Sequence, residues 1–354
     1  MASPPLALLL SAWTTEGPYL KGGAERAGAS TARALKQVGF DVVSISSGAW
    51  NGRTPRPPLR QQFSDESGHM VETIERAALV VALDRYPGEL PRTCPSILQL
   101  SNLAYENERS AANPEWWSAA WVPSTHLRDA LVFSFGWAPD RVRVIPPVLE
   151  LAALDRDPGD GLRAVLSAAA CDVPRSRLLL FPHRSDKGKG LYSVLALLER
   201  LLSRDRNWRL LVSGPSGEES DEEEILVQIR HDTDLHQHIR LLPWWPAPSM
   251  AFLYRAAGCT VMASQLDEGF GLVPYESVLA GTPVVARSTG ALTYDQATRY
   301  GFHLVEDVAS DRCVEVIEAA AGLAMPTQYR RAIAGSFSND RYISLVGDSL
   351  RSLQ

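Results

Sequence analysis

Short apolar runs of strand length alternate with stretches of helical periodicity along the chain, and this alternation limits the possible folds more than any other feature. The apolar run 5–10 is followed by a helical pattern over 24–38 and by the strand-like segment 41–45. Further strand-length runs, each bounded by turn residues, occupy 78–83, 96–100, 119–123 and 142–147. Strands that alternate with helices in this way predict an α/β fold in which helices cover a doubly wound parallel sheet.

A segment rich in proline and glycine divides this pattern into two halves. The double proline 146–147 and the polar stretch 155–161 resist core packing. The alternation begins again after them with the run 177–182 and an apolar helix face over 191–202. With 354 residues, of which 45% are hydrophobic, the chain is long enough for two cores. The domains that we expect are 1–155, 156–335 and a C-terminal helix over 336–354 that can cross back to the first domain.

The charge and the cysteine content exclude several classes of protein. A net charge of −6 at pH 7 and a sequence pI near 5.7, without a long basic run, argue against a nucleic-acid partner. The four cysteines are widely spaced and include no Cys-x-x-Cys pair, which is typical of a reducing compartment. The apolar run near the N-terminus is too short to cross a bilayer and has no basic segment before it, so we expect a buried first strand and a cytoplasmic protein.

A basic, glycine-containing loop follows the strand run 177–182. The loop HRSDKGKG, residues 183–190, places Arg184 and Lys189 directly before a helix. Helix N-termini and glycine turns favour anions, and a fixed arginine together with a lysine adds the countercharge that a diphosphate needs. A basic loop on a solvated rim remains the alternative for this stretch taken alone.

Two glutamates flank a glycine turn in DEGFGLVPYESVLAGTPVVA, residues 267–286. Glu268 precedes the turn, and Pro274 suits the first turn of the helix that follows. Backbone N–H groups at 271–273 can hold a phosphate at this helix start. Glu276 lies in the first helical turn, where the helix dipole favours a carboxylate. Its two oxygens can accept hydrogen bonds from both hydroxyls of a ribose, while Glu268 faces whatever lies beyond the phosphate.

Three stretches, 183–190, 210–217 and 267–286, resemble the nucleotide-sugar-binding domain of the retaining glycosyltransferases of family 4 (glycosyl transferases group 1), within the large GT-B group. The hallmark of that family is a pair of glutamates separated by seven residues, which Glu268 and Glu276 match. The likeness extends over about 177–295 and is weaker before 150. There, LKGGAER at 20–26 is similar to the family's glycine-rich first loop, and WVPSTHLRDAL at 121–131 to its serine-marked strand and helix.

The resemblance implies a GT-B fold of two Rossmann-like domains, with the donor bound mainly by the second and the acceptor by the first. It implies that Arg184 and Lys189 neutralise the diphosphate leaving group and that Glu268 holds the donor sugar, which makes these three the catalytic set. The reaction keeps the anomeric configuration and needs no metal. The other residues that it places around the donor are Gly22, Gly23, Pro243, Trp244, Gly269, Phe270, Gly271, Leu272, Val273 and Glu276.

The first domain departs from the family pattern. Many members carry a histidine beside the donor sugar, where the stretch 97–108 offers Ser101 and Asn102 instead. The usual asparagine and glycine after a later strand are replaced by Pro147 and Val148. We assign Ser101, Asn102 and Tyr105 to the acceptor side. The departures leave two alternatives open, namely a catalytically altered or silent protein that binds a nucleotide sugar, and a relative that acts on the nucleotide sugar itself, such as an epimerase or a phosphorylase.

The expected substrates follow from the resemblance and the composition. We expect a UDP-sugar as donor, with neither a metal nor another cofactor. Residues 1–50 carry few basic side chains, and acidic ones balance them, so we expect a soluble acceptor and no membrane association. Arginine far outnumbers lysine, which is typical of GC-rich bacterial genomes, and a bacterial secondary metabolite is the acceptor that we expect.

Overall fold

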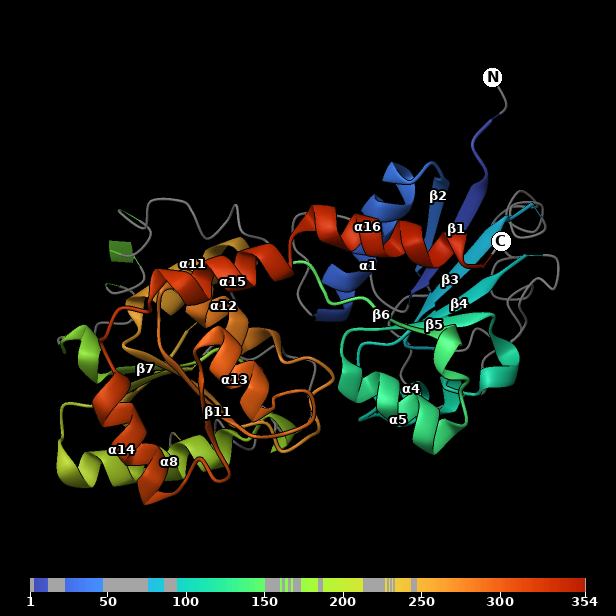
Figure 1. Ribbon diagram of the computed structural model, residues 1–354. Helices are drawn as coiled ribbons and strands as arrows, with labels where there is room; N and C mark the ends of the chain where they lie inside the picture. The colour runs from blue at the N-terminus through green and yellow to red at the C-terminus, as the bar shows by residue number, and fades with distance from the viewer. Residues whose placement is uncertain are drawn as a thin grey trace. The chain divides into compact units, whose positions relative to one another are not determined.

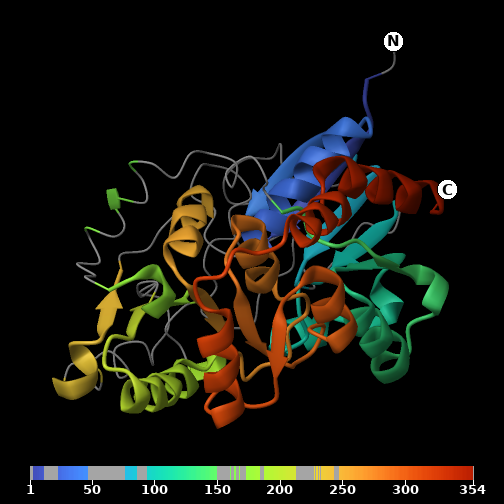
Figure 2. The same cartoon turned by 60° about the vertical axis from the view of Figure 1, so that its left-hand side comes forward.

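The structure, a computed structural model, divides the chain into two units. The first comprises Met1–Val148 with Phe337–Gln354, and the second comprises Leu149–Ser336. Figures 1 and 2 show both units from two directions. The residues that the structure describes are 3–11, 23–46, 76–85, 94–149, 160, 163, 164, 167, 173–183, 187–212, 227, 229, 231, 233–242 and 247–353.

The first unit is built on a six-stranded parallel sheet with the order β2-β1-β3-β4-β5-β6. The strands are β1 (Leu6–Ser11), β2 (Asp41–Ser46), β3 (Leu79–Leu83), β4 (Ser96–Gln99), β5 (Ala119–Val122) and β6 (Val142–Val144). All residues of β3, β4 and β5 are buried, as expected for strands with helices on both faces. Such burial explains why these strands are continuous apolar runs in the sequence.

Helices cover both faces of this sheet. They are α1 (Gly23–Gln37), α4 (Glu106–Ala111), α5 (Thr125–Phe135) and α16 (Asn339–Arg351), with the 3₁₀ turns η1 (Pro114–Trp116) and η2 (Pro139–Arg141). In Figures 1 and 2, α1 and α16 lie side by side. The hydroxyl of Thr31 lies 2.6 Å from that of Tyr342, and the indole Nε1 of Trp121 donates to the hydroxyl of Ser349 at 2.8 Å. These buried bonds fix the C-terminal helix α16 in the first unit.

The second unit repeats the arrangement, with a parallel sheet in the order β12-β11-β10-β7-β8-β9. The strands are β7 (Leu178–Phe181), β8 (Arg209–Val212), β9 (Ile239–Leu241), β10 (Cys259–Met262), β11 (Val284–Arg287) and β12 (His303–Val305). From β7 the chain moves outward through β8 and β9, and it then returns to the other side of β7 at β10. The two sheets confirm the predicted α/β class with two doubly wound domains, and the strand order turns between β7 and β10.

The helices of the second unit form two layers. They are α8 (Leu191–Arg204), α10 (Thr233–His236), α11 (Ala247–Ala256), α12 (Leu272–Ala280), α13 (Tyr294–Tyr300), α14 (Asp311–Ala320) and α15 (Thr327–Ser336), with the 3₁₀ turns η3 (Arg175–Arg177) and η4 (Lys187–Lys189). Figures 1 and 2 show α8 and α14 together on one side of the sheet, and α11, α12 and α15 on the other. Of the helices in the described part of the chain, none is both long and apolar enough to span a bilayer.

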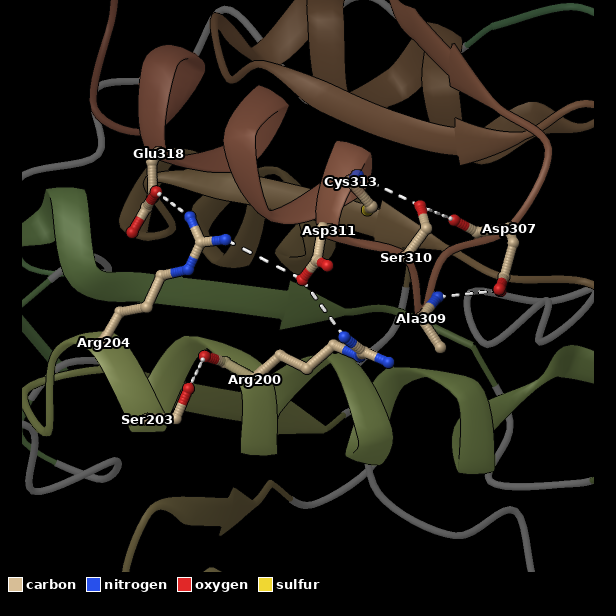
Figure 3. A network of polar contacts seen from close by, with 9 residues as sticks. All are labelled: Arg200, Ser203, Arg204, Asp307, Ala309, Ser310, Asp311, Cys313 and Glu318. Atoms are coloured by element: carbon tan, nitrogen blue, oxygen red, sulfur yellow. Dashed lines mark hydrogen bonds and ion pairs between the residues drawn. The ribbon is translucent and has the colours of Figure 1, made fainter.

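Charged side chains on the outer surface link α14 to α8, as Figure 3 shows. Arg200 of α8 pairs with Asp311 at 3.1 Å, and Arg204 pairs with Glu318 at 3.0 Å. All four side chains are exposed, so each pair is worth at most about 1 kcal/mol. The start of α14 is held more firmly, because the hydroxyl of Ser310 accepts a hydrogen bond from the backbone N–H of Cys313 at 3.2 Å.

The exposed ion pairs and the N-cap of α14 should contribute differently to the free energy of unfolding. Replacing Ser310 with Ala leaves a backbone donor of α14 without its cap, and we expect the free energy of unfolding to fall by about 0.5–2 kcal/mol. Replacing Arg200 with Ala removes an exposed pair, for which we expect a loss below about 1 kcal/mol. Urea unfolding followed by tryptophan fluorescence measures both. A larger loss for Arg200→Ala than for Ser310→Ala would contradict this ranking.

Candidate functional site

The loops that follow β7 and β10 meet at the point where the strand order of the second sheet turns. Open α/β sheets bind their ligands at the carboxyl ends of the strands beside such a point. The backbone N–H of Gln265, in the loop after β10, donates to the carbonyl oxygen of Gly188, in the turn after β7, at 2.8 Å. The two loops identified from the sequence as anion-binding are therefore joined directly.

A glycine allows these loops to approach. Gly190 follows the turn η4, precedes α8 and adopts a left-handed conformation, with φ +78°. A Cβ atom at this position would lie 2.0 Å from the carbonyl oxygen of Ala263, at the end of β10. That oxygen belongs to the backbone directly after a sheet strand, so moving it would cost free energy by disturbing the strand. Only glycine fits here, and its presence brings the basic loop against the acidic one.

The centre of the site is an ion pair between Lys189 and Glu268. The Nζ atom of Lys189 lies 2.9 Å from Oε1 of Glu268, and the two side chains are only 17% and 11% exposed. Burial alone would raise the pKa of the Glu268 carboxyl, but Lys189, His183 and a hydrogen bond from Ser264 together outweigh burial and lower this pKa below its ordinary value. Glu268 is therefore an anion at neutral pH, held in place by its cation.

A tight turn between β11 and α13 fixes the backbone of Glu268. The N–H of Ala291 donates to the carbonyl oxygen of Glu268 at 2.8 Å. Gly290 has φ +56°, and a Cβ atom there would lie 2.3 Å from the same oxygen. The hydroxyl of Thr289 also donates to Oδ1 of Asp267 at 3.1 Å. The acidic loop is thus held from two sides, by the turn after β7 and by the turn after β11.

The residues from Gly269 to Val273 lead into α12, which begins at Leu272. Gly271 is the N-cap residue in a left-handed conformation, with φ 77°, and it has no side chain to cap the helix. The first N–H groups of α12 can therefore bind an anion, which the helix dipole also favours. Phe270 is buried and stacks on Tyr275 with ring centroids 4.8 Å apart, which anchors the turn. Leu272 is half-buried and opens the helix.

Glu276 lies in the second turn of α12, and the prediction that it lies in the first turn is wrong because the helix already begins at Leu272. Its side chain is half-buried. The hydroxyl of Tyr254, which is on α11, donates to its Oε2 atom at 3.0 Å. Tyr254 is 2% exposed. The sequence analysis did not find this partner, because a tyrosine at helical spacing with apolar neighbours is typical of a core position.

His183 and Ser264 were missed as well. Both act on the charge of Glu268. His183 comes two residues after β7 and Ser264 two residues after β10. That position, at the carboxyl ends of the two central strands, is the signal that could have identified them.

Of the remaining residues predicted around the donor, the structure describes only Gly23. Gly23 is the first residue of α1, in the first unit. The rest lie outside the described residues, namely Gly22, Arg184, Pro243 and Trp244.

The predicted acceptor-side residues follow β4 at the carboxyl end of the first sheet. The backbone N–H of Ser101 donates to Oδ1 of Asp84 at 2.5 Å. Asn102 accepts a hydrogen bond from the N–H of Leu103 at 2.8 Å, and Tyr105 is 44% exposed at the start of α4. The structure therefore places these residues together after β4, where the backbone of Ser101 and the side chain of Asn102 hold the loop.

A buried carboxyl pair at the same edge was not predicted. Asp84 follows β3 and has φ 55°, which is rare for a residue other than glycine. Burial raises its pKa to about 6 although Ser101 donates to it. Burial, followed by the charge of Asp84, raises the pKa of Glu108 to about 8. Within the described part of the chain, the histidines, cysteines and carboxylates form no group of three or more that could hold a metal ion.

Known proteins resemble this chain in sequence and in fold. Residues 173–321 match the family described as glycosyl transferases group 1. D-inositol 3-phosphate glycosyltransferase 1 of Catenulispora acidiphila is 35% identical over 199 residues, which cover 54% of this chain and 46% of that protein. The chain spans about half the length of the curated relatives that it matches first.

Solved structures share the fold of the whole chain. The Anabaena protein HepE, solved in complex with UDP and glucose, has a TM-score of 0.72 and 17% identity, and the match covers 98% of this chain and 99% of that one. A glycosyltransferase of Rickettsia africae has a TM-score of 0.75 and 16% identity, and the match covers 99% of each chain. At this level of identity the likeness shows the fold alone.

The buried ion pair predicts a stability change that depends on pH. Lys189→Met leaves the Glu268 carboxylate without its cation, and we expect the free energy of unfolding at pH 7 to fall by roughly 2–4 kcal/mol. Burial raises the pKa of a carboxyl that has lost its cation, so the deficit should shrink as the pH falls to 5 and Glu268 takes up a proton.

The double variant is the control. Lys189→Met with Glu268→Gln removes both charges, so it should be more stable at pH 7 than Lys189→Met alone. Urea unfolding of the wild type, Lys189→Met, Glu268→Gln and the double variant at pH 7 and pH 5 measures these differences. Losses that simply add, with no pH dependence, would show that the two charges do not interact.

Proposed function

We propose that the chain transfers a sugar from a nucleoside diphosphate donor to a hydroxyl of a soluble acceptor, because residues 173–321 match the glycosyl transferases group 1 and the chain has the GT-B fold. A UDP-sugar is the proposed donor. The observation that carries this proposal is the Lys189–Glu268 pair, which lies beside the uncapped N-terminus of α12 where the strand order turns. Fixed positive charge of this kind suits a diphosphate.

The first proposed task of the site is to stabilise the leaving group. As the bond to the sugar breaks, negative charge develops on the diphosphate. A lysine already held in position and the first N–H groups of α12 stabilise that charge without reorganising at the moment of reaction. Arg184 is proposed to add a second cation. Complexes of HepE with UDP and with UDP-glucose support a nucleotide-sugar donor for a protein of this fold.

The ion pair changes the role proposed for Glu268. In the resemblance this glutamate holds the donor sugar. In this chain its carboxylate also holds Lys189, at 2.9 Å. We therefore assign Glu268 two tasks, which are to orient the sugar and to position the cation that meets the diphosphate. The reaction proposed is front-face transfer with retention, in which the donor phosphate takes the acceptor proton and no glycosyl-enzyme bond forms.

The acceptor is proposed to be a small soluble polyol. The curated relatives are named D-inositol 3-phosphate glycosyltransferases, so their names point to a cyclitol phosphate. A cyclitol-containing secondary metabolite agrees both with these names and with the arginine-rich composition, which is typical of GC-rich bacterial genomes. The second candidate function is donor binding without transfer to an acceptor, and Ser101 and Asn102 favour it because they stand where many family members carry a histidine.

The leaving-group assignment predicts a loss of turnover in one lysine variant. Lys189→Ala should lower kcat for donor hydrolysis or transfer by roughly tenfold to a thousandfold, the range for removal of an electrostatic donor in the transition state. Lys187→Ala is the matched control, because Lys187 lies in the same turn but is exposed. It should keep kcat within about twofold of the wild type. Equal rates for Lys189→Ala and the wild type would reject the assignment.

Metal independence is a second prediction. A site that neutralises its leaving group with lysine, arginine and a helix N-terminus leaves no task for Mg²⁺. We expect the initial rate with a UDP-sugar to be unchanged by EDTA and by added Mg²⁺ or Mn²⁺. Loss of activity in EDTA that Mg²⁺ or Mn²⁺ restores would contradict the proposed chemistry.

A further inference from the structure

The hydrogen bond from Tyr254 to Glu276 joins two helices at the edge of the candidate donor site. Tyr254 is on α11 and Glu276 on α12, and the phenol oxygen lies 3.0 Å from Oε2. The tyrosine is 2% exposed, whereas the glutamate is half-buried. A buried phenol therefore reaches a carboxylate that a ligand can also reach.

The backbone of Tyr254 is held independently of this contact. Its carbonyl oxygen accepts a hydrogen bond from the hydroxyl of Thr282 at 2.6 Å, and Thr282 is fully buried at the end of α12. The guanidinium of Arg175 donates both to the carbonyl oxygen of Arg255 at 3.0 Å and to the hydroxyl of Thr282 at 3.0 Å. The C-terminal end of α11 is thus fixed to the turn that ends α12.

A second buried bond strengthens the same junction. The hydroxyl of Ser277 donates to the carbonyl oxygen of Thr282 at 3.0 Å, and it lies 2.8 Å from the hydroxyl of Thr260 on β10. Ser277 and Thr260 are fully buried. The junction therefore ties α11 and α12 to the central strand, so the phenol of Tyr254 is presented to Glu276 from a rigid support.

The geometry matters for Glu276 because a glutamate carboxylate rotates easily. The terminal torsion of a glutamate is broad and has no sharp rotamers, so packing alone does not set the plane of the two oxygens. A hydrogen bond from a fixed donor does set it, and bonds to ionised acceptors are stronger than those between neutral groups. A carboxylate can accept about four hydrogen bonds, so one from Tyr254 is compatible with two more from a vicinal diol.

We propose that Tyr254 is a positioning residue that orients the carboxylate of Glu276 toward the 2′- and 3′-hydroxyls of the donor's ribose. The inference rests on the proposed function, because it requires a nucleoside diphosphate in this site. It assigns the selection of ribose over 2′-deoxyribose to the tyrosine and the glutamate together. Tyr254 itself touches no substrate and acts through Glu276.

Calorimetric titration of UDP and dUDP tests this role. The wild type should bind UDP about 5- to 150-fold more tightly than dUDP, because a missing hydroxyl leaves the half-buried carboxylate of Glu276 short of a partner. Tyr254→Phe should weaken UDP about 3- to 10-fold, the range of one hydrogen bond, and should weaken dUDP less. The ratio between the two ligands should therefore narrow by at least about twofold.

Three further variants make the test specific. Tyr275→Phe is the matched control, since Tyr275 neighbours Glu276 on α12 and is as buried as Tyr254, but its hydroxyl donates to Gln296. It should leave the UDP-to-dUDP ratio unchanged. In a Glu276→Ala background, adding Tyr254→Phe should change UDP affinity by less than about twofold, because the partner through which the tyrosine acts is gone.

The outcomes separate the inference from the proposed function. A wild-type ratio in Tyr254→Phe, even with a lowered melting temperature, would show that the tyrosine is only structural and would overturn the inference. Additive effects of Tyr254→Phe and Glu276→Ala would overturn it too. Either result leaves UDP binding by the wild type, and so the proposed function, intact. Failure of the wild type to bind UDP, GDP, ADP and dTDP would overturn both.

Discussion

Two loops approach one another closely at the carboxyl ends of β7 and β10, and their contact forms the candidate site of the second domain. The parallel sheet brings the ends of these strands together, and Gly190 allows the turn after β7 to lie against the backbone of Ala263. Lys189 and Glu268 then form a pair that is shielded from water. The site depends on this contact, because a cation that solvent could reach would lose much of its electrostatic effect.

The same arrangement presents the donor with a balance of charges. In the absence of a ligand, Glu268 compensates Lys189, which limits the cost of burying each charge. A diphosphate that arrives at the start of α12 brings more negative charge than the carboxylate and also meets the helix dipole. In the proposed complex, the ammonium of Lys189 can therefore contact the phosphate while it stays close to the carboxylate of Glu268. In that proposed complex, the sugar next to the phosphate lies beside an anion that is already oriented, which is the preorganisation that electrostatic catalysis requires.

Much of the fold could be predicted from local pattern, and the reasons are physical. Strands covered on both faces are continuous apolar runs, so β3, β4 and β7 were identifiable directly. The leucine-rich face of α8 and the spacing of Glu268 and Glu276 were also visible in one short window each. These features depend on neighbours in sequence, which is the information that a single chain provides.

The contacts that the sequence did not indicate depend instead on the tertiary structure. Tyr254 acts through Glu276, which lies 22 positions further along the chain. Asp84, which follows β3, raises the pKa of Glu108, which lies 24 positions further along the chain in α4. The ion pair of Lys189 with Glu268 joins groups 79 positions apart. Each contact joins segments that are far apart in the sequence, so neither segment alone indicates it.

The most direct test of the account is the position of UDP in a crystal structure of the complex. The account predicts that the terminal phosphate lies within hydrogen-bonding distance of the Lys189 ammonium and of the first N–H groups of α12. It also predicts that the ribose hydroxyls lie on the carboxylate of Glu276. A well-ordered UDP bound elsewhere, with the Lys189–Glu268 pair and the start of α12 facing only water, would contradict the account.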